Sequence, residues 1–164
     1  MSVFRGALLA VMLCTAGQAQ ALSCLRADVA TTYLKAANSD RQYMVVLGRF
    51  LFDESALKTA AEDMKQSRQA RQTPARFSGH YLTKTGFVAP WSSTIGLQVD
   101  CAASWCGGLQ SGVQTLAFVQ TNGADHTLHL SPCGDTTFVN PHAGDIGSVV
   151  ACHKGRQCGS STTR

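Results

Sequence analysis

The sequence has few charged residues and only one long apolar run. Asp, Glu, Lys and Arg make up 15% of its 164 residues, below the roughly 25% that is usual in globular proteins. The net charge of +4 is too small to indicate a nucleic acid as partner. The apolar run, residues 7–14, is shorter than the about 20 residues that a membrane-spanning helix needs. We therefore expect neither a nucleic-acid partner nor a transmembrane span.

The motifs of common catalytic and metal sites are also missing. No Cys-x-x-Cys occurs, since Leu109 stands where a second thiol would follow Cys106, and no Gly-x-Ser-x-Gly or phosphate-binding loop is present. His126 and His129 form a His-x-x-His pair, but residues three apart in a strand point to opposite faces. Asp100 has no carboxylate partner nearby in the sequence, so we expect its side chain to cap a turn and not to act in catalysis. The sequence thus predicts no catalytic residue, no metal site and no cofactor.

What is present is an unusual number of cysteines, seven in all. Cys14 lies within a predicted signal peptide, residues 1–21, in which Arg5 precedes the apolar run and an Ala-x-Ala pattern ends at Ala21. Cleavage there leaves an even set, which in an exported chain indicates up to three disulfides. We expect a periplasmic or secreted protein. The cysteines of the mature chain are Cys24, Cys101, Cys106, Cys133, Cys152 and Cys158.

The cysteine spacing favours one local disulfide. Cys152 and Cys158 can close a short loop, which leaves the other four cysteines to pair among themselves near one end of a sheet. Trp105 is expected to pack on a disulfide beside Cys106. An alternative for Cys24 is a lipid anchor, because residues 21–24 are similar to a bacterial lipobox.

Hydrophobic patterning predicts short strands with helices at the periphery. Asp28 begins a helix that it caps, and Gly48 marks a bulge or bend in an apolar strand. Residues 53–75 form a polar insertion, in which a short amphipathic helix is followed by a mobile connection. The expected helices are 28–37 and 144–152, and the expected strands are 43–52, 76–83, 95–101, 113–120 and 126–130.

Five strands in a chain of this length suggest a small OB-like barrel. We expect one mainly β domain (α+β), residues 22–164, stapled by disulfides and carrying peripheral helices. If the last three strands form a meander, Cys101, Cys106 and Cys133 lie near one end of the sheet.

The cysteine and strand arrangement resembles the netrin-like modules, the group that includes tissue inhibitors of metalloproteinases. The resemblance rests on the early Cys24, the strand 43–52, the segment 77–82 (Phe-Ser-Gly-His-Tyr-Leu) and the later cysteines. It implies an OB-type barrel with a terminal helix, tied to its N-terminus by disulfides and serving as a binding module. The family's inhibitory mechanism needs cysteine as the first mature residue. Here the predicted first residue is Leu22, so that mechanism would require further processing that exposes Cys24.

The function expected is that of an exported, non-enzymatic binding module whose partner is another envelope or extracellular protein. Its expected contact surface is the loop 86–93, with Phe87 and Trp91, together with the turn at Trp105. The alternatives are a lipid-anchored envelope protein, and an inhibitor-like factor or enzyme with an unrecognised site.

Overall fold

The computed structural model describes residues 24–25 and 27–159. The predicted signal peptide lies outside the described residues. In chain order the elements are α1 (Val29–Ala37), β1 (Gln42–Leu51), α2 (Glu54–Ser67), β2 (Gln72–Thr83), β3 (Gly86–Val99), β4 (Cys101–Ala102), β5 (Trp105–Cys106), β6 (Gln114–Asn122), β7 (Asp125–Leu130), β8 (Thr137–Val139) and α3 (Ala143–His153).

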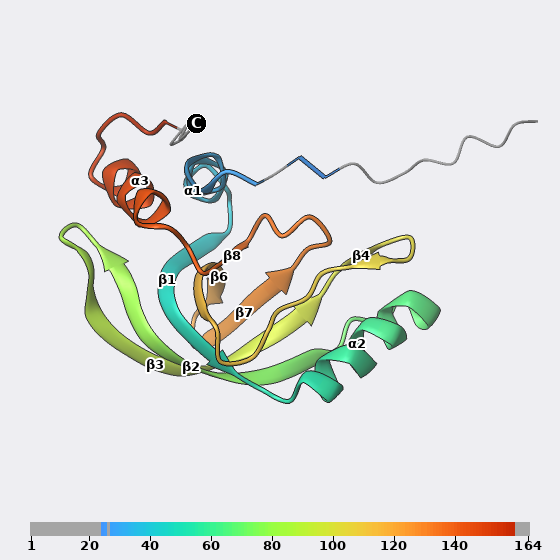
Figure 1. Cartoon of the computed structure of the whole chain (residues 1–164). Coiled ribbons are helices and arrows are strands. Elements are labelled where there is room, and N and C mark those ends of the chain that lie inside the picture. Colours follow the sequence, from blue (N-terminus) through green and yellow to red (C-terminus); the bar gives the residue numbers. More distant parts are fainter. Residues whose placement is uncertain (1–23, 26, 160–164) are drawn as a thin grey trace, which may run out of the picture.

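Five of the strands pair in a closed ring (Figure 1). The order is β1-β2-β3-β7-β6, and β6 pairs back to β1. The β3–β7 pair is parallel, and the other pairs of the ring are antiparallel. The short β8 extends the sheet beside β6. The prediction of a mainly β protein with peripheral helices is confirmed.

Alternation along the strands divides the apolar residues between two cores. The first lies inside the ring, where Phe50, Phe77 and Ile95 are fully buried. Leu57 of α2 packs against this core, so the helix covers one mouth of the ring.

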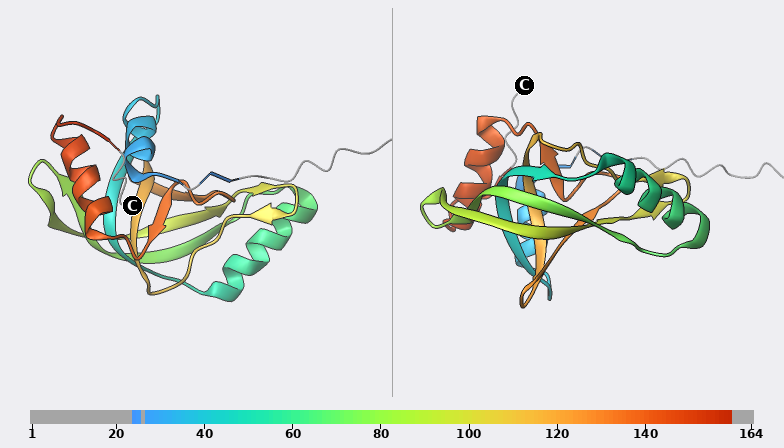
Figure 2. Two further views of the ribbon diagram at one scale, coloured as in Figure 1. Left: turned by 45° about the horizontal axis from the view of Figure 1, so that its top comes forward. Right: turned by 90° about the horizontal axis from the view of Figure 1, so that it is seen from below.

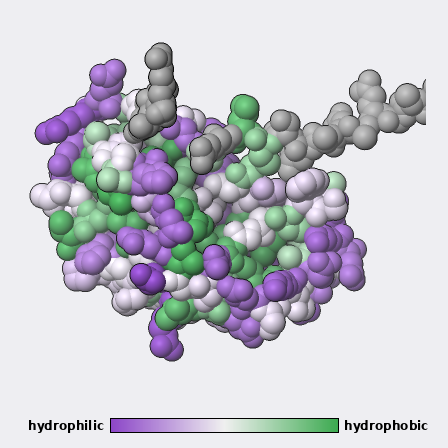
Figure 3. Space-filling view, viewed as in Figure 1, coloured by the Kyte–Doolittle hydropathy of each residue, from purple (hydrophilic) through white to green (hydrophobic). Residues whose placement is uncertain are grey.

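The second core lies between the outer face of the sheet and the two terminal helices. Leu116 and Phe118 of β6 point outward and pack with Val29 of α1 and Val149 of α3. Helices α1 and α3 therefore lie side by side over the same part of the sheet, away from α2 (Figures 1 and 2). On the face shown in Figure 3, hydrophobic residues gather below α1 and α3, whereas hydrophilic residues dominate over α2.

The insertion at residues 53–75 is more ordered than expected. The side chain of Asp53 accepts hydrogen bonds from the backbone N–H groups of Ser55 and Ala56, and the helix it caps runs to Ser67. The short amphipathic helix expected in the first half is therefore present, and it extends three residues into the predicted mobile connection 65–72. Residues 68–71 then link α2 to the start of β2 at Gln72. Leu57 and Ala60 of the helix are buried, which fixes it on the ring.

Two further hypotheses about the strands are wrong. Residues 86–93 form no loop, because β3 already begins at Gly86. The last three strands form no meander, because β7 lies between β3 and β6. The connection 100–113 is long enough to carry the chain past β7 before β6 begins.

Gly48 marks a close approach of two strands, and the register of β1 shows no bulge there. A Cβ atom at Gly48 would lie 2.4 Å from the carbonyl oxygen of Ser78 and 2.7 Å from Cα of Gly79. Glycine is needed at this position because neither neighbour is a movable side chain.

Three disulfides staple this fold. Cys152 pairs with Cys158 as predicted. Cys101 pairs with Cys106 across the hairpin of β4 and β5. Cys24 pairs with Cys133, 109 residues away, and so ties the start of the described chain to the segment that follows β7.

Candidate functional site: a tyrosine-lined groove

The three aromatic residues predicted to bind a partner do not lie together. Phe87 is half-buried against the second core. Trp91 packs on the first core, with its ring centroid 5.3 Å from that of Phe77 and 5.1 Å from that of His126. Trp105 is 62% exposed. Trp105 is thus the most exposed of the three, whereas Phe87 and Trp91 are half-buried and pack on different cores.

A concave surface lies between the terminal helices and the sheet. We call it the tyrosine groove, because all three tyrosines of the chain line it. Its volume is about 620 Å³, within the range of ~300–1,000 Å³ typical of small-ligand sites. The residues that line it are Tyr33, Ala36, Ala37, Ser39, Arg41, Gln42, Tyr43, Met44, Val45, Tyr81, Leu82, Thr121 and His153.

Each tyrosine reaches the groove from a different element. Tyr33 lies on α1, Tyr43 on β1 and Tyr81 on β2, where the pairing with β1 ends. Tyr33 and Tyr43 also pack against the second core, whereas Tyr81 is 37% exposed. Tyrosine combines a broad apolar ring with a hydroxyl that can donate or accept a hydrogen bond, which suits a surface that is partly wet.

A polar contact fixes one wall of the groove. The hydroxyl of Tyr33 lies 2.9 Å from Nδ1 of His153, and the two rings meet edge to face at a centroid distance of 6.0 Å. Burial raises the pKa of the Tyr33 hydroxyl above its ordinary value of 10.0, because the anion loses hydration.

The groove is basic at its rim. Arg41 directly precedes β1, and its guanidinium donates to Oε1 of Gln120 at 3.5 Å. No Asp or Glu is among the described residues that line the groove. Since arginine is always protonated at physiological pH, the lining favours an apolar ligand that carries a negative charge.

The sequence gives no local signal for this groove. Tyr33, Tyr43 and Tyr81 are far apart in the chain and belong to no motif. They come together only because β1 pairs with β2 and because α1 packs beside α3.

One acid–base pair outside the groove was also missed by sequence reasoning. Nδ1 of His129 lies 3.1 Å from Oδ2 of Asp100, and Oδ1 of Asp100 accepts from Nε2 of Gln98 at 3.4 Å, so this carboxylate contacts two side chains. The parallel pairing of β3 with β7, in which Gln98 stands opposite His129, brings the two together. Among the described residues, no serine or cysteine side chain bonds to the His129 ring, and no three His, Cys, Asp or Glu side chains cluster to hold a metal.

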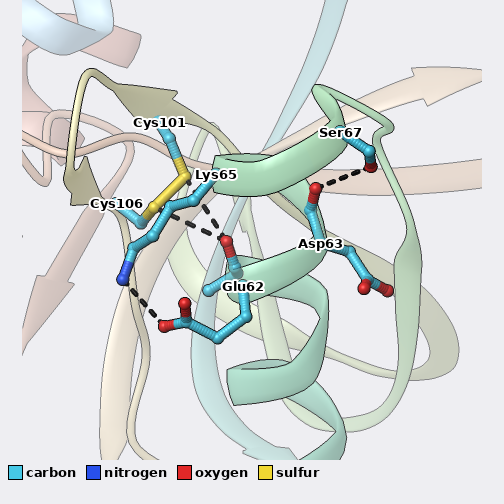
Figure 4. Close-up of a disulfide and its surroundings, with 7 residues drawn as sticks. Glu62, Asp63, Lys65, Ser67, Cys101 and Cys106 are labelled. Atoms are coloured by element: carbon cyan, nitrogen blue, oxygen red, sulfur yellow. Dashed lines mark hydrogen bonds and ion pairs between the residues drawn. A yellow bond between two sulfur atoms is a disulfide. The ribbon is translucent and has the colours of Figure 1, made fainter.

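The disulfide between Cys101 and Cys106 packs on helix α2. The two sulfur atoms lie 4.0 and 3.9 Å from the carbonyl oxygen of Ala61 (Figure 4). Glu62 and Lys65 form an ion pair beside it, with a distance of 2.8 Å from Nζ to Oε1. The bridge thus closes the β4–β5 hairpin and lies in contact with the helix that covers the ring.

Comparison with known proteins returns no relative: no family model, no curated protein and no solved structure matches this chain. None of the helices in the described part has both the length and the apolar character needed to cross a membrane.

Proposed function

We propose that this protein is an exported binding module with an OB-like barrel, and that the tyrosine groove is its ligand site. The observation that carries the proposal is the convergence of three tyrosines from three elements on one groove with a basic rim and no acidic lining residue. Ligand sites are typically concave and mostly apolar, with a few polar groups that fix orientation.

The strand order supports the OB-like part of the proposal. An OB-fold is a five-stranded Greek-key barrel, and here five strands pair in a ring with β3 parallel to β7. The resemblance to netrin-like modules gains support from the Cys24–Cys133 disulfide, because such modules are tied to their N-terminus by disulfides. The packing of the terminal helix α3 on the sheet is a second point of support.

Two observations favour a soluble exported module over the alternatives. Sγ of Cys24 is bonded to Cys133, and the same sulfur cannot also carry a lipid. Three disulfides in one chain are typical of an oxidising compartment. Intact mass spectrometry of the exported protein tests this: we expect a chain that starts at Leu22 with all six cysteines oxidised. A start at Cys24 with added acyl mass would support the lipid-anchored protein instead.

Binding in the groove is tested directly by two-dimensional ¹⁵N NMR of the mature chain titrated with small aromatic acids, such as indole-3-acetate and 4-hydroxyphenylacetate. We expect the amide shifts to cluster on the groove, and Tyr81→Ala to weaken binding. Trp105→Ala is the matched control, because it removes an exposed aromatic ring outside the groove. Shifts confined to the surroundings of Trp105, or none at all, would overturn the assignment of the groove.

A further inference from the structure

The floor of the tyrosine groove is a strand with an open edge. On one side, β1 pairs with β6 along its length, from Gln42 to Arg49. On the other side, β2 pairs with β1 only from Val46 onward. Residues 42–45 thus have no neighbouring strand on that second side in the described part of the chain. All four of them line the groove.

The edge is open because the β2–β3 hairpin bends away. The register between β2 and β3 shifts at Tyr81 and Leu82, which is where the pairing of β2 with β1 stops. A bulge of this kind bends the strand and increases its twist. Beyond it, Leu82 and Phe87 pack into the second core under the terminal helices. The backbone of the hairpin thus leaves β1 beyond Val46, whereas the side chain of Leu82 packs in the same core as that of Val45, which is buried.

An open edge carries unused hydrogen-bonding groups. Successive residues of a strand direct their N–H and C=O groups to alternate sides, so two of the four residues 42–45 direct theirs into the groove. Such an edge is a template for another extended chain. From this geometry, and resting on the proposed function, we propose that the groove binds an extended peptide segment, which adds a short strand to β1 at residues 42–45.

The residues that line the groove also indicate which side chains the peptide should carry. Tyr33, Tyr43 and Tyr81 offer ring surface for one apolar or aromatic side chain. Arg41 is exposed at the beginning of the edge and has five N–H donors, of which Gln120 takes one at 3.5 Å. No acidic residue lines the groove, so a carboxylate on the peptide, from an acidic side chain or from its C-terminus, can pair with Arg41.

A second open edge makes a poorer template. Residues 86–95 of β3 pair with β2 alone, because β7 joins β3 only at Gly96. Pro90 lies within this edge, and proline removes a backbone donor and blocks strand pairing. No such residue interrupts 42–45.

The test uses the mature chain and a random library of N-acetylated octapeptides, from which the tightest binder is selected and its affinity measured by fluorescence anisotropy. The peptide is then resynthesised with one N-methyl group at each position in turn. We expect losses of about tenfold or more at alternate positions within the bound stretch, because only every second amide faces β1.

Arg41→Gln should weaken binding about tenfold, and Trp105→Ala should leave it unchanged. Amidation of the peptide C-terminus separates a terminal from a side-chain carboxylate.

Each other outcome overturns the proposal in a defined way. If N-methylation causes no alternating loss, or if the peptide shifts amides of residues 86–95 or the β4–β5 hairpin, strand addition to β1 is wrong. If no peptide binds while the aromatic acids still shift the groove amides, strand addition is wrong and the proposed ligand site stands. If neither binds, both proposals fail.

Discussion

The hydroxyl of Tyr33 lies 2.9 Å from Nδ1 of His153, a contact between residues 120 positions apart that joins α1 to α3. Tyr33 and His153 both line the tyrosine groove, so their contact fixes the position of one of its walls. The ring of Tyr33 also packs on the second core. The stability of the terminal helices and the shape of the ligand site thus depend on the same side chain.

Replacing Tyr33 by Phe keeps the ring and removes the hydroxyl. We expect a loss of about 1 kcal/mol in the free energy of unfolding, the usual net value of one hydrogen bond, measured by urea denaturation. A double-mutant cycle with His153→Ala should show that the two effects are not additive. Full additivity would show that the contact contributes nothing.

The raised pKa of Tyr33 has a consequence at alkaline pH. A group whose folded pKa lies above its unfolded value of 10.0 contributes stability below that pH and loses it as the pH rises through the folded pKa. Titration of tyrosinate absorbance should therefore show a component above pH 10.0 that is absent from Tyr33→Phe. A titration of the variant that retains this component would assign it to another residue.

The three disulfides should contribute unequally. The Cys24–Cys133 bridge spans 109 residues and the Cys152–Cys158 bridge spans 6. Because a longer loop loses more entropy when it is closed in the unfolded state, replacing the first pair by serine should cost about 2.5 kcal/mol more than replacing the second. Equal losses of unfolding free energy in the two paired variants would contradict this.

Gly48 should not tolerate a side chain. Gly48→Ala places a Cβ atom 2.4 Å from the carbonyl oxygen of Ser78, and we expect a loss of about 1–3 kcal/mol, as for an overpacked core. Gly108→Ala is the matched control, because a Cβ atom there has no neighbour within 4 Å. Its effect should stay within about 0.5 kcal/mol. A similar tolerance at both positions would show that the strands can move apart.

The cap of α2 should make stability depend on acidic pH. Hydrogen bonds from the side chain and backbone of Ser55, and from the backbone of Ala56, lower the pKa of Asp53 below its ordinary 3.8. The charged cap therefore stabilises the fold above pH 3.8 and loses its effect as the pH falls through the lowered value. Asp53→Ala should be less stable than wild type at neutral pH, and the difference should shrink in acid. Asp53→Asn, which keeps an acceptor, should retain most of the cap.

Local patterns in the sequence predict much of the fold. Asp28 caps α1 as expected, and Cys152 pairs with Cys158. These features depend on residues close together in the chain. Gly86 and Pro90 predict a turn where the structure has the start of β3. Pro90 fits a strand there because β3 has a neighbour on only one side at that point.

Long-range pairing explains what the sequence does not reveal. The parallel β3–β7 pair, which brings Asp100 to His129, joins segments that have no matching local signal. The tyrosine groove also depends on long-range pairing. Tyr43 and Tyr81 line one cavity because β1 pairs with β6 along residues 42–49 but with β2 only from Val46 onward. Phe87 and Trp91 were selected for their residue type, and packing on the two cores places them elsewhere.

Hydrogen exchange of individual backbone amides in the free, mature protein tests the open edge of β1 most directly. Amides that bond to β6 should exchange slowly, and those that face the groove should exchange fast. We predict an alternation over residues 42–45, two slow and two fast, followed by uniformly slow exchange over 46–49, where β1 has a neighbour on both sides. Slow exchange at all four residues 42–45 would show that the edge is already covered, and would contradict the account.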